Sequence, residues 1–122
     1  MKYSVINKNK DFVKAYKKGK CVAGRACLVY FRKEYRNRKD GVQFTRVGIS
    51  TSKKIGNAVQ RSRARRVIRA ALRNCPLPAG YDVIITAREG VIACKSYNVE
   101  SFLKGKVIPA MQSSQGGKTG ER

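Results

Sequence analysis

Acidic residues are scarce in this sequence, and histidine is absent. Its 122 residues include 28 lysines and arginines against 7 aspartates and glutamates, which gives a formal net charge of +21. Without histidine, and without paired carboxylates in a recognisable motif, the chain has no obvious set of groups for acid–base or two-metal hydrolysis. A positive field of this size destabilises the compact state by self-repulsion and attracts polyanions. The expected partner is therefore a nucleic acid, with an anionic membrane as the weaker alternative.

Long apolar runs are also missing. No stretch approaches the roughly 18 to 20 apolar residues of a membrane span, and lysines interrupt the N-terminal segment where a signal sequence would be apolar. We therefore expect a cytoplasmic protein with no membrane partner.

Cysteine is present but not in a metal-binding pattern. The four cysteines lack C-x-x-C spacing, and no histidine is available to complete a mixed zinc site. We therefore predict no metal site and interpret the cysteines as small, mostly buried apolar residues, with a disulfide as the weaker alternative. They are Cys21, Cys27, Cys75 and Cys94.

The length and patterning of the chain favour one folded unit. A chain of 122 residues with 42% hydrophobic residues can bury a single core. We expect one nucleic-acid-binding domain over residues 1–111, followed by a polar, disordered tail over residues 112–122. No internal repeat is visible.

Apolar periodicity places three helices and three strands along this domain. Helices are predicted at residues 7–18, 57–74 and 96–111, with Asn7 or Asn9 capping the first and Ser96 capping the last. Strands are predicted at residues 22–32, 42–52 and 81–89. The order helix, strand, strand, helix, strand, helix indicates an α+β domain, with a small mixed sheet of about four strands packed with three helices.

The second helix has an arginine face and an apolar face. A helical wheel gathers six arginines within an arc of about 200° and five apolar residues opposite them. No acid occurs in residues 41–79, so ion pairs do not relieve the repulsion within the helix. A merely solvated face is the alternative, but arginine without lysine favours bidentate binding of phosphate. Gly56 allows the backbone to leave the strand, and Asn57 is a helix cap beside which a phosphate could also bind.

RNA suits these features better than DNA. The element before the basic helix is a strand, so the helix-turn-helix arrangement is missing, and the sequence has neither zinc ligands nor leucine heptads. A basic helix suits structured RNA, and a sheet that carries aromatic residues suits unstacked bases.

One segment resembles a known family. The stretch "SKKIGNAVQRSRARRVIR", residues 52–69, is similar to the signature of the protein component of bacterial ribonuclease P: a lysine pair, then Gly-Asn-Ala-Val, then Arg-Asn-Arg with further basic residues. The flanking stretches "TRVGIST" and "DFVKAYKKGK" also resemble that family, so the likeness covers about residues 7–88. Ser62 departs from the pattern, because the family has asparagine there.

The resemblance implies a function. In that family a catalytic RNA with magnesium removes the 5′ leader of precursor tRNA, and the protein is an accessory subunit without catalytic residues. It therefore implies ribonuclease P RNA and precursor tRNA as partners, one protein per RNA, and magnesium bound mainly by the RNA. It also implies a left-handed strand–helix–strand crossover, against the usual right-handed rule. A ribosomal or other structural RNA-binding protein is the alternative.

The resemblance also assigns two sets of binding residues. Leader-binding positions are Phe12, Tyr16, Tyr30 and Lys53. The positions expected to contact the catalytic RNA are Lys54, Arg61, Arg63, Arg65, Arg66 and Arg69. For Phe12 and Tyr16 the alternative is the ordinary core face of an amphipathic helix, and the side on which Tyr30 lies stays open.

Overall fold

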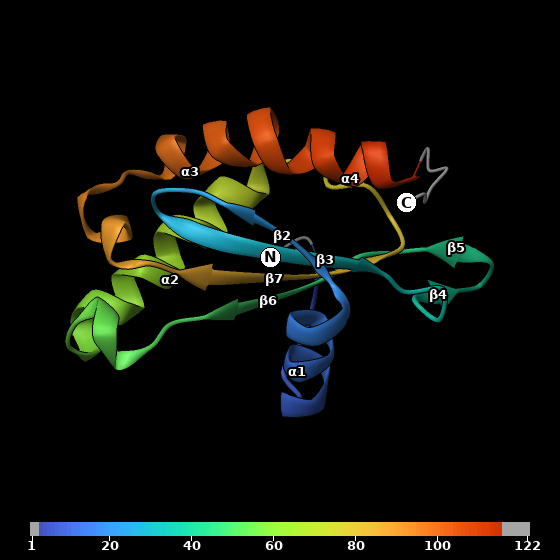
Figure 1. Cartoon of the computed structure of the whole chain (residues 1–122), viewed down its shortest axis with the longest axis horizontal. Coiled ribbons are helices and arrows are strands. Elements are labelled where there is room, and N and C mark those ends of the chain that lie inside the picture. Colours follow the sequence, from blue (N-terminus) through green and yellow to red (C-terminus); the bar gives the residue numbers. More distant parts are fainter. Residues whose placement is uncertain (1–2, 116–122) are drawn as a thin grey trace.

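The computed structural model describes residues 3–115, which form a mixed five-stranded sheet with helices on both faces (Figure 1). The strand order is β1-β6-β7-β3-β2. β1, β6 and β7 run parallel, whereas β3 is antiparallel to both β7 and β2. The bounds are β1 Ser4–Val5, β2 Lys20–Ala23, β3 Cys27–Lys33, β6 Arg46–Ser50 and β7 Tyr81–Ala87.

The remaining elements are helices and one small hairpin. The α-helices are α1 Asn9–Lys18, α2 Ala58–Arg73, α3 Ser96–Phe102 and α4 Ile108–Gln115. Short turns of helix occur at η1 Lys53–Ile55 and η2 Glu89–Ala93, and a π-helical turn, η3 Leu103–Val107, joins α3 to α4. The hairpin of β4 Arg38–Lys39 and β5 Val42–Gln43 projects from one end of the sheet (Figure 1).

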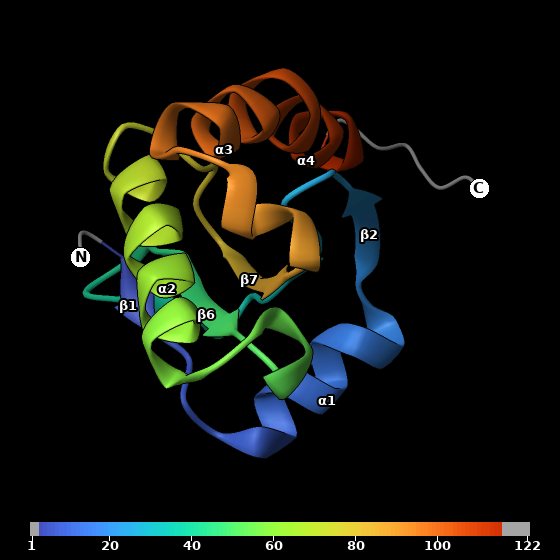
Figure 2. The same ribbon diagram turned by 90° about the vertical axis from the view of Figure 1, so that its left-hand side faces the viewer.

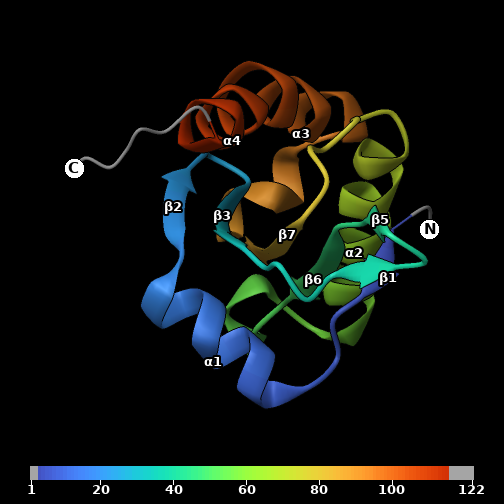
Figure 3. The same ribbon diagram turned by 90° about the vertical axis from the view of Figure 1, so that its right-hand side faces the viewer.

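The two faces of the sheet are covered unequally. Views along the strands show α2, α3 and α4 on one side and α1 alone on the other (Figures 2 and 3). The main core lies under α2, α3 and α4. As the wheel predicts, α2 contributes its apolar face: Ala64, Val67, Ile68, Ala71 and Leu72 are all buried. None of the described helices is long and apolar enough to cross a bilayer.

The side of the sheet under α1, here called the open face, has a smaller core. Ile6, Ala15 and Ile84 are buried there, with Phe12 and Tyr30 packed against them. Because side chains alternate along a strand, the strand register places Leu28, Tyr30, Ser50 and Thr86 on this same face. Leu28, Ser50 and Thr86 are only half-buried, so α1 leaves part of the face uncovered.

The cysteines behave as the sequence predicts. None of the four forms a disulfide within the described residues; Cys27, Cys75 and Cys94 are buried and Cys21 is exposed. Burial raises the pKa of Cys27 to about 12.

The predicted α+β class and its mixed sheet are confirmed, but several boundaries were wrong. The strand predicted at 22–32 is a hairpin, because residues 24–26 turn the chain from β2 into β3. The strand predicted at 42–52 is divided into β5 and β6, since β5 pairs with β4 and β6 with the main sheet. β1 is an additional strand of two residues that pairs with the distant β6.

The ends of two helices also differ from the prediction. Lys8 is the N-cap of α1 and makes no side-chain capping bond, so neither Asn7 nor Asn9 caps it. Lys95, and not the predicted Ser96, is the N-cap of α3. The Lys95 N–H donates to Asn98 Oδ1 at 2.8 Å.

The last helix is longer than predicted. Pro109 has no N–H and would break a regular ladder, and the π-helical turn just before it absorbs that irregularity, as π-bulges commonly do. The helix then continues to Gln115, past the predicted end at residue 111. The rest of the predicted tail, residues 116–122, lies outside the described part.

Candidate nucleic-acid interface

Two tyrosines meet where α1 borders the open face. The rings of Tyr16 and Tyr30 are perpendicular, with centroids 4.8 Å apart. The Tyr16 hydroxyl shares a hydrogen bond with Thr86 Oγ1 at 3.2 Å, which fixes the ring against β7. Partial burial, together with the nearby Cys21, raises the pKa of Tyr30. Because Tyr16 is 39% exposed, this pair presents aromatic surface beside the uncovered part of the sheet.

Phe12 has a different role in the structure. A Cβ atom built on Gly48 would lie 2.9 Å from Phe12 Cζ and 3.0 Å from Ile84 Cδ1. The ring therefore occupies the space that a side chain at position 48 would need. Phe12 lies at a predicted leader-binding position, but much of its ring holds α1 to the sheet.

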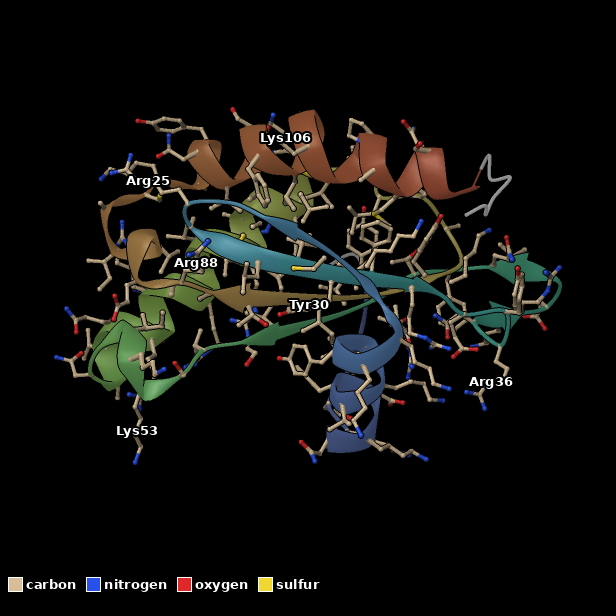
Figure 4. The ribbon with its side chains drawn as sticks, viewed as in Figure 1. Arg25, Tyr30, Arg36, Lys53, Arg88 and Lys106 are labelled. Carbon is tan, nitrogen blue, oxygen red and sulfur yellow. The ribbon has the colours of Figure 1, made fainter. Side chains whose placement is uncertain are left out.

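Lys53 and Lys54 lie in η1, between β6 and α2. Buried Ile55 anchors this turn, and Ser52 Oγ accepts a hydrogen bond from the Lys54 N–H at 3.3 Å. Both lysine side chains are exposed. Lys53 extends away from the sheet on the side where α1 lies (Figure 4).

The predicted cap of α2 is present. Asn57 Oδ1 accepts from the Gln60 N–H, and Gln60 Oε1 accepts from the Asn57 N–H, both at 2.9 Å. Gly56 precedes this capping box with φ +145°, and a Cβ there would lie 1.9 Å from Gln60 Oε1. Glycine is therefore required both by the backbone and by the folded-back glutamine.

Three arginines of α2 are held by protein oxygens. Arg61 Nη1 donates to Gly56 O at 2.7 Å, and Arg65 Nη1 donates to Thr51 Oγ1 at 2.8 Å. Arg63 donates to two backbone carbonyls of the segment before α3, at 3.4 and 3.2 Å. A guanidinium has five N–H donors, so each arginine keeps donors for phosphate while its position is restricted.

The other arginines of α2 extend into solvent. Arg66, Arg69 and Arg73 are exposed, and Arg66 Nη1 donates to Ser62 Oγ at 3.2 Å. Ser62, the departure from the family pattern, thus contacts an arginine one turn further along. No ion pair between residues 3 and 115 involves an arginine of α2, so these charges are not neutralised within the described fold.

Two further cations lie at the same end of the sheet as η1 (Figure 4). The sequence alone did not predict them as binding residues. Arg25 is in the turn between β2 and β3, and Arg88 follows β7 (Figure 4). Arg88 Nη1 donates to Gly24 O at 3.0 Å, which holds the two segments together. The pairing of distant strands brings them together, so no local spacing signals it.

A buried acidic network at the other end was also missed. Asp82 accepts from Arg46 Nη2 at 2.6 Å and from Asn37 Nδ2 at 2.8 Å. Glu34 accepts from Arg32 Nη1 at 2.8 Å and from Arg36 Nε at 3.1 Å. Hydrogen bonds from Arg36 and Arg32 lower the Glu34 pKa to about 2, despite opposing desolvation. These carboxylates stabilise the base of the β4–β5 hairpin.

The described residues do not form a magnesium site of the usual kind. No group of three or more His, Cys, Asp or Glu residues gathers between residues 3 and 115. The two buried carboxylates, Glu34 and Asp82, already accept hydrogen bonds from arginines. A magnesium ion prefers carboxylate oxygens that are free to coordinate it, so these residues do not fit one.

Comparison with known proteins gives consistent matches. A family model described as Ribonuclease P matches residues 1–108. The ribonuclease P protein components of a Clostridium botulinum strain and of Brevibacillus brevis are 33% and 35% identical to this chain. The first match covers 86% of each chain, and the second covers 96% of this chain and 94% of its relative.

Solved structures agree with the sequence matches. The Staphylococcus aureus RNase P protein superposes with a TM-score of 0.71 at 31% identity, over 92% of this chain and 97% of the other. The Thermotoga maritima RNase P protein has the same TM-score at 23% identity, over 88% and 96%, which shows a shared fold. On the family match over residues 1–108 and these relatives, the chain belongs to the ribonuclease P protein family.

Proposed function

We propose that this chain is the accessory protein subunit of a ribonuclease P that removes 5′ leaders from precursor tRNA. Membership of the family implies an RNA partner. The observation that carries the proposal is the set of arginines on α2 that form no ion pair within residues 3–115, next to a sheet face that is partly uncovered and bordered by aromatic rings. As a cytoplasmic subunit it would pair with one catalytic RNA.

The open face suits the single-stranded leader. Tyr16 and Tyr30 provide flat surface for unstacked bases, and stacking is worth about 1–3 kcal/mol per base whatever its identity. Lys53 extends on the same side of the sheet (Figure 4), where it would contact the backbone phosphates of the leader. Phe12 supports this surface from below by fixing α1 on Gly48.

The arginine face of α2 suits the catalytic RNA. Arg61, Arg63 and Arg65 are held in place by protein oxygens, so binding phosphate costs them less side-chain entropy. Arg66, Arg69 and Lys54 are exposed and can adapt to the RNA surface. Neutralising phosphates there releases counterions and lets RNA strands approach each other.

The protein contributes binding and orientation in this proposal. Magnesium would be held by the RNA, where it would stabilise the charge that develops at the cleaved phosphate. The protein's cations would lower the magnesium concentration at which the RNA folds and binds substrate.

Reconstitution with the cognate ribonuclease P RNA tests the proposal. Adding the protein should increase cleavage of precursor tRNA at low magnesium. Tyr16→Ala should weaken binding of precursor tRNA about tenfold, the loss expected for one base–aromatic stack, and leave mature tRNA unaffected. Tyr16→Phe is the matched control, because it keeps the ring and removes only the hydrogen bond to Thr86.

Three outcomes would contradict the proposal. Equal weakening of precursor and mature tRNA by Tyr16→Ala would refute the leader assignment. Cleavage by a protein preparation free of RNA would refute the accessory role. Failure to bind the ribonuclease P RNA, with tight binding to ribosomal RNA instead, would favour the alternative of a ribosomal or structural RNA-binding protein.

A further inference from the structure

A groove between α2 and α3 joins two of the assigned arginines to residues that have no assigned role. Arg63, Arg66, Val67 and Ala70 line one side, and Lys95 and Tyr97 line the other. Its volume of about 480 Å³ is in the range of small-ligand sites. Most of its lining surface is apolar, whereas its rim is cationic.

Tyr97 is the most unusual residue of this groove. Its side chain is 66% exposed on the first turn of α3. Among the residues that the structure describes, its hydroxyl makes no hydrogen bond and its ring meets no other aromatic ring or cation. The ring therefore offers a free flat surface beside Val67 and Ala70.

The rim determines the chemistry of the occupant. Arg63 is fixed there by the carbonyls of Ile92 and Cys94, and Arg66 and Lys95 are exposed. No acid lines the groove. Glu100, one turn beyond Tyr97 on α3, is already paired with Lys104 at 2.9 Å. Three cations around an apolar floor repel a cationic protein segment and attract a phosphate-bearing one.

We propose that this groove binds one unpaired nucleotide of the catalytic RNA. The base stacks on Tyr97 over Val67 and Ala70, and its flanking phosphates lie beside Arg66 and Lys95. Aromatic stacking with cationic phosphate contacts is the usual way in which proteins hold an unstacked nucleotide. The proposal deepens the proposed function and rests on it, because it adds Lys95 and Tyr97 to the surface that contacts the ribozyme.

Binding of the cognate ribonuclease P RNA, measured over a salt titration, tests this site. Tyr97→Ala should weaken affinity about tenfold, the loss of one stack, with no change in the slope of log K against log salt. Tyr97→Phe should bind like the wild type, since the ring face is kept. Lys95→Ala should instead reduce the slope by about one, the signature of a lost phosphate contact.

Tyr35→Ala is the matched control. Tyr35 is 70% exposed and lies between β3 and β4 in the chain. The β4–β5 hairpin projects from the end of the sheet opposite to α3 (Figure 1), so the loss of Tyr35 should leave RNA affinity unchanged. A photo-crosslinking amino acid at position 97 should react with one short unpaired segment of the RNA.

The outcomes separate this site from the proposed function. If the wild type binds the RNA and Tyr97→Ala binds equally well, the groove proposal is refuted and the function stands. An equal loss in Tyr97→Phe would indicate a hydroxyl contact and refute stacking. A change in oligomeric state of Tyr97→Ala, without a change in RNA affinity, would show that protein covers the groove. If the wild type does not bind the RNA, the proposed function itself fails.

Discussion

Glu34 shows how one residue holds a segment of this highly basic protein. It is 7% exposed and accepts hydrogen bonds from Arg36 and Arg32, which lower its pKa from 4.5 to about 2. The folded state therefore favours the carboxylate. The stability that Glu34 contributes is complete above pH 4.5 and is lost as the pH falls toward 2.

Replacing this carboxylate tests the linkage. At pH 7, Glu34→Gln should lower the free energy of unfolding by about 1–2 kcal/mol, less than the full pKa shift implies because Arg36 is exposed and water screens its charge. The difference from wild type should shrink toward zero near pH 2, as urea unfolding across pH would measure. Asp40→Asn, at an exposed hairpin position, should leave stability at pH 7 nearly unchanged. A constant deficit of Glu34→Gln at every pH would contradict the assignment.

At the scale of elements, the start of α2 depends on one glycine. Gly56→Ala would force a Cβ into Gln60 Oε1 at a backbone φ of +145°. We expect a loss of about 1–3 kcal/mol of unfolding free energy from strain and the broken capping box. Gly105→Ala is the opposite case, because its Cβ would meet nothing within 4 Å and alanine favours helix by about 1 kcal/mol. Thermal or urea unfolding of both variants should show opposite signs; a neutral Gly56→Ala would refute the cap argument.

The elements also differ in how well the sequence predicts them. The helix predicted at 57–74 agrees with α2 to within one residue at each end, because 3.6-residue periodicity and the Asn57 cap are local signals. β1 escapes prediction because a two-residue exposed strand has no pattern of its own, and only pairing with β6 defines it. The arginine row of the candidate site can be predicted from the sequence, because its members lie on one helix. The groove at Tyr97 and the Arg46–Asp82 pair require segments that only the fold brings together.

For the whole molecule, the charge of +21 makes salt act in opposite directions on folding and on binding. Added salt screens self-repulsion, so the free energy of unfolding of the free protein should rise between about 50 and 300 mM salt. Affinity for the ribonuclease P RNA should fall over the same range. Seven phosphate contacts, one for each of the six cations assigned to the ribozyme and one for Lys95, predict a slope of log K against log salt of about −6. Urea unfolding and filter binding measure the two effects; a protein destabilised by salt would show that native ion pairs outweigh repulsion.

Phe12 and Gly48 have a consequence for the shape of the open face. The ring rests directly on the main chain of β6, so one aromatic side chain sets the height of α1 above the sheet. Neither the ring nor the glycine carries a charge. The distance between α1 and the sheet should therefore stay the same when added salt screens the charged contacts around it. The protein thus combines a spacing between α1 and the sheet that is insensitive to ionic strength with a binding surface of arginines and lysines that is sensitive to it.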